Sequence, residues 1–203
     1  MDLQTWLLYA LACVGLALSP GPNGLLALTH GALHGPRKAA WTALGGTFGF
    51  VLLIAASMFG IGALLQASST GLTALKWAGG AYLVWLGVQV WRSPPIGVDL
   101  RAAAGAVRPA SLFRQALLTA LTNPKALLFF IAFLPQFVDP ARPLFTQFVV
   151  MALTYAVIEV AFEIALAAAA HRISPWLQRS GRRFNQGCGA VFVAIGVLLP
   201  LRG

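Results

Sequence analysis

The chain has 203 residues, of which 59% are hydrophobic and only 9% carry a formal charge. A soluble domain carries roughly 25% Asp, Glu, Lys and Arg, so this composition excludes an ordinary water-soluble globular protein. The formal net charge of +9 is high enough to suggest a nucleic-acid partner. However, the basic residues interrupt long apolar runs and do not gather beside a polar surface, which argues against nucleic-acid binding.

Two uncharged runs, residues 3–36 and 39–75, are each longer than the roughly 20 residues with which a helix crosses a bilayer. The sequence therefore predicts an all-α membrane protein in a lipid bilayer, with about six transmembrane helices. No basic residue precedes the first apolar run, as it would in a signal peptide, so we expect that run to be a retained first span. The predicted helices cover residues 3–29, 39–65, 72–91, 113–138, 144–170 and 184–201.

The longest polar connection, residues 92–112, contains Pro94, Pro95 and several arginines. It predicts a cytoplasmic linker that divides one polytopic membrane domain, residues 1–203, into halves 1–91 and 113–203. Most other basic side chains follow the first and fifth predicted helices. By the positive-inside rule these connections lie in the cytoplasm, and the N- and C-termini lie outside it.

Three helices per half mean that the second half enters the membrane from the side opposite to the first. Homologous halves would then form a 3+3 inverted repeat, an architecture common in secondary transporters. A register that pairs residues 16–28 with residues 118–130 places Pro22 opposite Pro124. We therefore expect helices 1 and 4 to be structural equivalents, each broken at its proline.

The first predicted helix is interrupted by Ser19-Pro20-Gly21-Pro22-Asn23-Gly24. Each proline lacks an N–H donor, so Pro20 should free the carbonyl of Leu16 and Pro22 that of Leu18. Within a membrane, unwound backbone is tolerated only where protein or a water-filled cavity satisfies it. A kink that only shapes packing is the alternative. We interpret the following residues as substrate-binding candidates: Pro20, Gly21, Pro22, Asn23 and Gly24.

The fourth predicted helix contains a second break at Asn123-Pro124-Lys125. Pro124 should free the carbonyl of Ala120. Lys125 lies near the middle of its span, where an ionised lysine costs on the order of 3 kcal/mol, so we expect it to face a polar interior or a carboxylate. The alternative is a permanent ion pair that holds two helices together. Asn123, Pro124 and Lys125 are therefore further substrate-binding candidates.

The fifth predicted helix carries two acidic residues, Glu159 and Glu163, with no charged neighbour in the adjoining sequence. Their i, i+4 spacing places both on one helix face. Because desolvation disfavours the charged form of a carboxyl group, both are candidate carriers of a coupling proton. For Glu163 the alternative is a side chain that extends to the interface near Arg172.

Other sequence features predict packing rather than chemistry. Gly45 and Gly49 form a GxxxG pattern that permits close helix packing. Cys13 and Cys188 have neither metal-ligand spacing nor a disulfide pattern, so we interpret them as small packing residues. The chain contains no Walker loop, paired-cysteine metal pattern or nucleophile elbow. We therefore expect no cofactor, no metal, no ATP-driven transport and no enzymatic activity.

The chain resembles the lysine exporter (LysE/RhtB) family in residues 19–23, 122–130 and 134–137. That family includes homoserine, homoserine-lactone and threonine efflux proteins. The resemblance implies a dimeric exporter in the bacterial inner membrane, which exchanges amino acids or close derivatives for protons. Its substrate would be of the threonine, homoserine, homoserine-lactone or lysine type. The family motifs fall on Pro20, Gly21, Pro22, Asn23, Asn123, Pro124 and Lys125.

Our working hypothesis is that the two broken helices meet and bind a zwitterion. The resumed half-helices and Lys125 would hold its carboxylate, while the freed carbonyls and Glu159 would hold its ammonium group. One alternative is a cation or metal exporter, although the predicted spans contain no Cys or His cluster. A second is a membrane enzyme acting on lipid, for which His30 and His34 are candidates near a membrane surface.

Overall fold

A computed structural model describes residues 1–19, 21–67, 69–92 and 107–170, together with scattered residues between 172 and 197. Pro20, Cys188, most of the predicted linker and half of the predicted last helix lie outside the described residues. For Pro124 and Lys125 the structure describes the backbone alone. All regular secondary structure in the described part of the chain is helical, as expected for the predicted all-α class.

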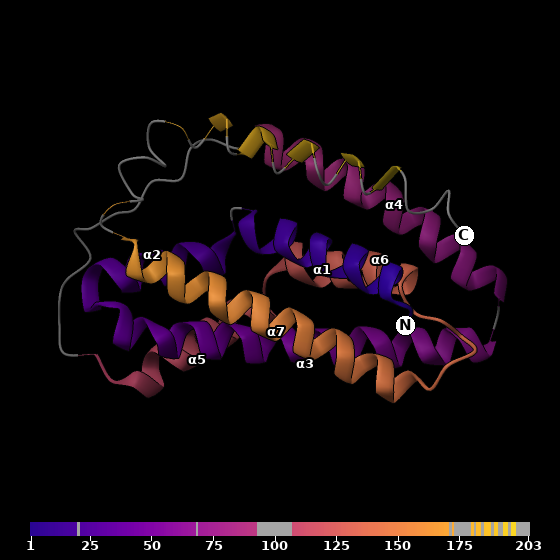
Figure 1. The fold of residues 1–203 in the computed structure, drawn as a ribbon, viewed down its shortest axis with the longest axis horizontal. Coiled ribbons are helices and arrows are strands. Elements are labelled where there is room, and N and C mark those ends of the chain that lie inside the picture. Colours follow the sequence, from indigo (N-terminus) through magenta and orange to yellow (C-terminus); the bar gives the residue numbers. More distant parts are fainter. Residues whose placement is uncertain are drawn as a thin grey trace.

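The helices follow the predicted order, but the structure divides two of the predicted spans (Figure 1). The first predicted span becomes α1 (Leu3–Leu18) and α2 (Pro22–His34). The fourth becomes α5 (Pro109–Leu121), α6 (Pro124–Phe133) and the short 3-10 helix η1 (Leu134–Gln136). The remaining described helices are α3 (Pro36–Ala67), α4 (Ser69–Arg92) and α7 (Leu144–Ala168).

The first break separates α1 from α2 and bends the chain by 58°. Ser19 ends α1 with extended backbone, and Gly21 precedes α2 with φ −153° and ψ 169°. Pro22 occupies the first turn of α2, where a missing N–H costs nothing because that group would have no partner within the helix. The predicted break is confirmed, and it ends one helix and starts another rather than kinking a continuous one.

The second break uses the same local chemistry. Thr122 ends α5, and Asn123 accepts a hydrogen bond from the backbone N–H of Ala126 at its side-chain Oδ1, at 3.4 Å. That geometry makes Asn123 the N-cap of α6. Pro124 then begins the helix. In both breaks a capping residue is followed directly by proline, and the new helix begins at that proline, Pro22 in α2 and Pro124 in α6.

One expectation about these breaks is wrong. The carbonyls of Leu16 and Ala120 are not left free, because they accept hydrogen bonds of 3.1 and 3.2 Å from the N–H groups of Ser19 and Asn123. Each helix tightens its last turn and so satisfies a carbonyl that would otherwise have no partner within the helix. These two carbonyls are therefore poor candidates for holding a substrate ammonium group.

Small residues allow several helices to approach closely. A Cβ atom added at Gly45 would lie 2.8 Å from backbone atoms of Phe113, and one added at Gly49 would lie 2.7 Å from the Cβ of Ala120. Residues 45 and 49 thus bring α3 against α5, which confirms the predicted packing role of this GxxxG pattern. At Gly31 an added Cβ would lie 2.6 Å from the Cα of Ala167, so α2 and α7 are also in close contact.

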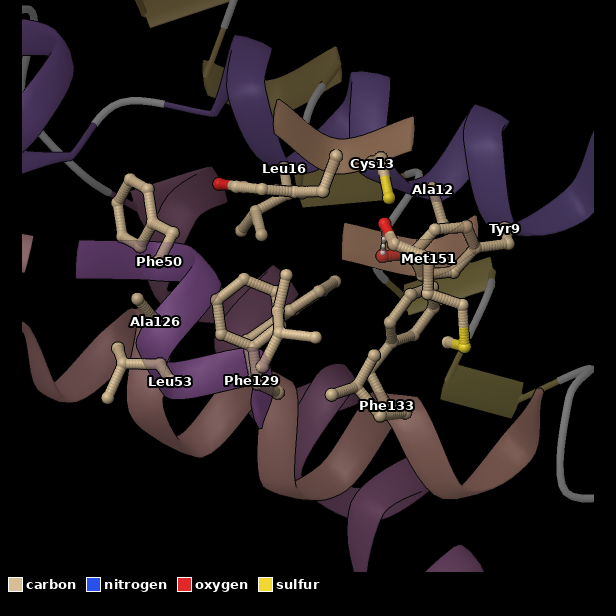
Figure 2. Close-up of a cluster of buried hydrophobic side chains, with 14 of the residues drawn as sticks. Tyr9, Ala12, Cys13, Leu16, Phe50, Leu53, Ala126, Phe129, Phe133 and Met151 are labelled. Carbon is tan, nitrogen blue, oxygen red and sulfur yellow. Dashed lines mark hydrogen bonds between the residues drawn. The ribbon is translucent and has the colours of Figure 1, made fainter. Parts of the chain in front are cut away.

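A buried aromatic cluster fills the space between α1, α6 and α7 (Figure 2). The Tyr9 ring stacks on Phe133 at a centroid separation of 6.0 Å. Its hydroxyl donates to the backbone carbonyl of Met151 at 3.0 Å, which ties α1 to α7. Cys13 is a buried free thiol within this cluster, which confirms its predicted packing role.

Two described helices, Pro36–Gly60 and Leu144–Ala168, are long and apolar enough to cross a membrane. The bent pair formed by α1 and α2 would add a third crossing if it is one span. Helices α3 and α7 pack against each other, and α3 also contacts α2, α4, α5 and α6. The helical membrane character is thus supported, whereas the count of six spans and the 3+3 repeat stay predictions.

Candidate functional site

Both helix breaks open on the same small cavity, although they lie about a hundred residues apart in the chain. The end of α1 and the first turn of α2 supply one side, and the first turn of α6 supplies another. Helices α3 and α7 complete it. The lining residues are Leu16, Ala17, Ser19, Gly21, Asn23, Gly24, Phe50, Asn123, Ala126, Tyr155 and Glu159.

The cavity has a volume of about 30 Å³. One water molecule needs about 10–15 Å³ measured in this way, so the space holds roughly two waters. That is less than an amino acid requires. Any amino acid that binds there must therefore first separate the walls of the cavity.

Two helix N-termini line the cavity. In α2 the first turn includes Asn23 and Gly24, and in α6 it includes Ala126. The first N–H groups of a helix have no partner within it and carry the positive end of the helix dipole. Two such ends at one cavity make it suited to a carboxylate.

The acidic side of the cavity comes from α7. Glu159 lines it and is only 5% exposed, and Tyr155 lies one turn earlier on the same face. Glu163 lies one turn later and is 1% exposed, but it does not line the cavity. The alternative in which Glu163 extends toward the interface is therefore wrong, because the close approach of α2 and α3 covers this part of α7.

Part of the cavity lining is apolar. Phe50, Leu16 and Ala126 belong both to the cavity lining and to the buried core, and Figure 2 shows them beside Leu53 and Phe129. A cavity with charged or polar groups on one side and aromatic carbon on another can accommodate a small molecule with a charged end and a short side chain.

The structure brings together most of the predicted binding residues. Gly21, Asn23, Gly24 and Asn123 line the cavity with Glu159. The backbone of Pro22 lies in the same turn of α2, and those of Pro124 and Lys125 lie in the first turn of α6. Pro20 and the side chain of Lys125 lie outside what the structure describes.

Sequence reasoning missed several residues of this site. Tyr155 could have been found from its spacing, because Met151, Tyr155, Glu159, Glu163 and Ala167 recur every four residues and are all buried. Phe50 carried no such signal, and Ser19 was recognised only as the first residue of the break at 19–24 and not as a binding residue. Their place at the cavity depends on which faces of α3 and α1 turn inward, and that is a property of the packed structure.

Comparison with known proteins gives an independent result. The family model described as LysE type translocator matches residues 14–203. The homoserine/homoserine lactone efflux protein of Salmonella typhi is 34% identical over 201 residues, covering 98% of this chain and 97% of that protein. The leucine efflux protein of Enterobacter sp. (strain 638) is 29% identical over 184 residues, covering 90% and 87% respectively.

An uncharacterized membrane protein of Vibrio cholerae is also 34% identical over 201 residues, covering 98% of each chain. No solved structure matches the chain. The matched residues extend across both helix breaks and the acidic helix α7, so the similarity includes every described element of the candidate site. By sequence, this protein belongs to the LysE type translocator family.

Proposed function

We propose that the protein exports amino acids or close derivatives from the cytoplasm across the bacterial inner membrane. The observation that carries this proposal is the cavity at which two helix N-termini and the buried carboxyl group of Glu159 meet. The relatives named for homoserine, homoserine lactone and leucine efflux support the same class of substrate.

The cavity chemistry suits a zwitterion. The first turns of α2 and α6 receive the α-carboxylate, with the positive charge of Lys125 adding to the two helix dipoles. Glu159 receives the α-ammonium group through a charge-assisted hydrogen bond. Ser19, beside the end of α1, is a further acceptor at this end of the substrate. Phe50 and Tyr155 contact the substrate side chain.

Size favours small substrates. A cavity of about 30 Å³ must expand for any amino acid, and a threonine- or homoserine-sized molecule requires less expansion than lysine. Expansion separates the first turns of α2 and α6 from α7, which opens the site toward one side of the membrane. Alternating access then follows when the two halves, a 3+3 inverted repeat, open toward each side in turn.

Export is coupled to protons through the carboxyl pair Glu159 and Glu163. When the outward-facing site binds a proton, Glu159 loses its charge and releases the ammonium group of the substrate. The protonated carrier returns, and the proton dissociates into the less acidic cytoplasm. The protein is a homodimer with both termini outside the cytoplasm, according to the family resemblance and the distribution of basic residues.

The test uses purified protein in proteoliposomes and a panel of labelled amino acids and lactones. Wild-type protein should exchange its substrate by counterflow and should accumulate it against a gradient when a pH difference is imposed. Lys125→Ala should abolish exchange, because the carboxylate loses its positive partner. Lys38→Ala is the control, since Lys38 is an exposed lysine at the start of α3.

Glu159→Gln separates binding from coupling. Glutamine keeps a polar acceptor for the ammonium group but carries no titratable proton. We expect counterflow to continue and accumulation driven by the pH gradient to disappear. Asp139→Asn is the matched control, because Asp139 forms an exposed salt bridge with Arg142. Full gradient-driven accumulation by Glu159→Gln would exclude Glu159 as the proton carrier.

A further inference from the structure

The side chains of Asn23 and Glu163 both approach Gly46 of α3, without a hydrogen bond between them in this structure. A Cβ atom added at Gly46 would overlap the side-chain amide nitrogen of Asn23 and would lie 3.6 Å from Oε2 of Glu163. Glycine at this position therefore leaves the space that both side chains occupy. The pair thus connects the first turn of α2, directly after the helix break, to the buried face of α7.

The hydrogen bonding of this pair is incomplete. Neither oxygen of Glu163 has a hydrogen-bond partner among the residues that the structure describes, and the same is true of Asn23 Oδ1. The Asn23 amide nitrogen donates only a long bond of 3.4 Å, to the carbonyl of Ala116. Both residues are at least 97% buried, so these polar atoms are withdrawn from bulk water.

An asparagine amide can serve a carboxyl group in either protonation state. Its nitrogen donates to an ionised carboxylate, and its oxygen accepts from the O–H of a protonated carboxyl group. Rotation about the Cβ–Cγ bond exchanges the two atoms. A charged aspartate, which only accepts, or a leucine, which does neither, could not serve both forms of Glu163.

Asn23 also lines the substrate cavity, which Glu163 does not. We propose that Asn23 is a positioning residue that couples the substrate cavity to Glu163. Its amide turns to match the protonation state of Glu163. This rotation moves the first turn of α2, where the substrate carboxylate binds. This inference rests on the proposed function. Within the carboxyl pair that carries the proton, Glu159 faces the substrate and Glu163 lies behind it, where Asn23 responds to its protonation state.

The neighbouring groups fit this division. Among the residues that the structure describes, Glu159 and Tyr155 of α7 are the titratable groups within electrostatic reach of Glu163, and Cys13 of α1 interacts with Glu159. From α2, α3 and α5 the described residues at this place are Asn23, Gly46 and Ala116, none of which titrates. Among these three residues, only Asn23 has a side chain that can both donate a hydrogen bond to Glu163 and accept one from it.

The first experiment compares counterflow with accumulation driven by a pH gradient. Asn23→Leu should lower gradient-driven accumulation relative to counterflow by about tenfold, the factor that corresponds to one hydrogen bond to a charged group. Asn23→Ser, which keeps a donor and an acceptor, should recover part of that loss. Equal losses in both assays for Asn23→Leu, without recovery in Asn23→Ser, would mean a purely structural role.

Gly46→Ala tests the same contact without changing a polar group. The added methyl group pushes the Asn23 amide away from Glu163, so we expect the same selective loss of coupling. Gly60→Ala is the matched control on α3, because a Cβ atom added there meets no atom within 4 Å. Unchanged coupling in Gly46→Ala would contradict the proposal.

A spectroscopic readout does not depend on transport. The infrared band of the protonated Glu163 carboxyl group is assigned by its loss in Glu163→Gln, and its pH midpoint is then measured in reconstituted protein. Asn23→Leu and Gly46→Ala should move this midpoint, whereas Gly60→Ala should not. An unmoved midpoint overturns the inference even if a variant transports poorly. If wild-type protein moves no amino acid at all, the proposed function fails instead.

Discussion

At the scale of single residues, the same chemical group has different roles according to its surroundings. Asp2 is an exposed carboxylate that caps α1: it accepts from the backbone N–H of Thr5 at 2.9 Å and from the Thr5 hydroxyl at 2.8 Å. Glu159 and Glu163 are buried carboxyl groups on α7, one at a cavity and one behind it. Water solvates the first, whereas only protein groups can stabilise the other two.

The cap gives a pH-dependent prediction for Asp2. The hydrogen bond from the Thr5 backbone N–H, followed by that from its hydroxyl, lowers the pKa of Asp2 below its usual value of 3.8. The cap therefore stabilises α1 above the unfolded-state pKa, and this stabilisation is lost as the pH falls through the folded-state pKa. We expect Asp2→Ala to lower the Tm at neutral pH, with the difference from wild type disappearing in acid.

Asp2→Asn is the control for this measurement, made by thermal unfolding in detergent. Asparagine retains a capping oxygen but does not titrate in this range. Its Tm should stay near that of wild type at neutral pH and should not lose a capping contribution in acid. If the Tm difference between Asp2→Ala and wild type is the same at neutral and at acid pH, the prediction that the Asp2 cap is lost on protonation is wrong.

At the scale of helices, proline and glycine decide where elements start and how closely they approach. Gly21-Pro22 and Asn123-Pro124 each place a capping residue before a proline, so α2 and α6 begin at fixed points. Because the caps are built from local bonds, these starting points need little support from the rest of the molecule. The glycines of α3 then set the distance to α5 and to Asn23.

Helix spacing can be tested at Gly45. An added Cβ would lie 2.8 Å from the Cα and carbonyl carbon of Phe113, and backbone atoms of a packed helix cannot move aside cheaply. We expect Gly45→Ala to destabilise the protein by about 1–3 kcal/mol, the usual cost of overpacking. The measurement is the free energy of unfolding in mixed micelles.

Gly60→Ala should have the opposite effect. Residue 60 lies on the exposed side of α3 and its added Cβ meets nothing within 4 Å. Alanine restricts the unfolded chain more than glycine, so this variant should be more stable by about 0.5–1 kcal/mol. If both alanine variants lose a similar amount of stability, the close contact between α3 and α5 is not the reason that residue 45 must be glycine.

At the scale of the whole molecule, the volume of the cavity limits what it can hold without a change in helix packing. The cavity admits only about two water molecules, so substrate entry requires its walls to move apart. Helix α3 contacts α2, α5, α6 and α7, which places it against both breaks and the acidic face. We therefore expect α3 to remain fixed relative to α5, since Gly45 and Gly49 bring those two helices into close contact.

The membrane orientation can be tested by cysteine labelling. In a background of Cys13→Ala and Cys188→Ala, a membrane-impermeant maleimide should label Gly203→Cys from outside intact spheroplasts. Arg101→Cys should be labelled only after lysis, because the basic linker lies in the cytoplasm by the positive-inside rule. The reverse labelling pattern would show that both termini lie in the cytoplasm. The side of the membrane assigned to each opening of the site would then have to be exchanged.

Local chemistry was enough to predict the membrane class, the two helix breaks and the unusual burial of the acidic residues of α7. A missing N–H at proline, a run of apolar residues and an i, i+4 spacing act over a few residues, so each can be recognised along the chain. The boundaries of α3 and α4 were also close to those predicted, at 39–65 and 72–91 against Pro36–Ala67 and Ser69–Arg92.

Packing between distant segments decided the rest. It places Glu159 at the cavity and Glu163 outside the cavity lining, although both are buried and share one helix face. It also brings Phe50 to the cavity wall and places Gly46 beneath Asn23. Such contacts depend on the relative rotation of whole helices, which is set by the sum of many side-chain contacts and not by any short stretch of sequence.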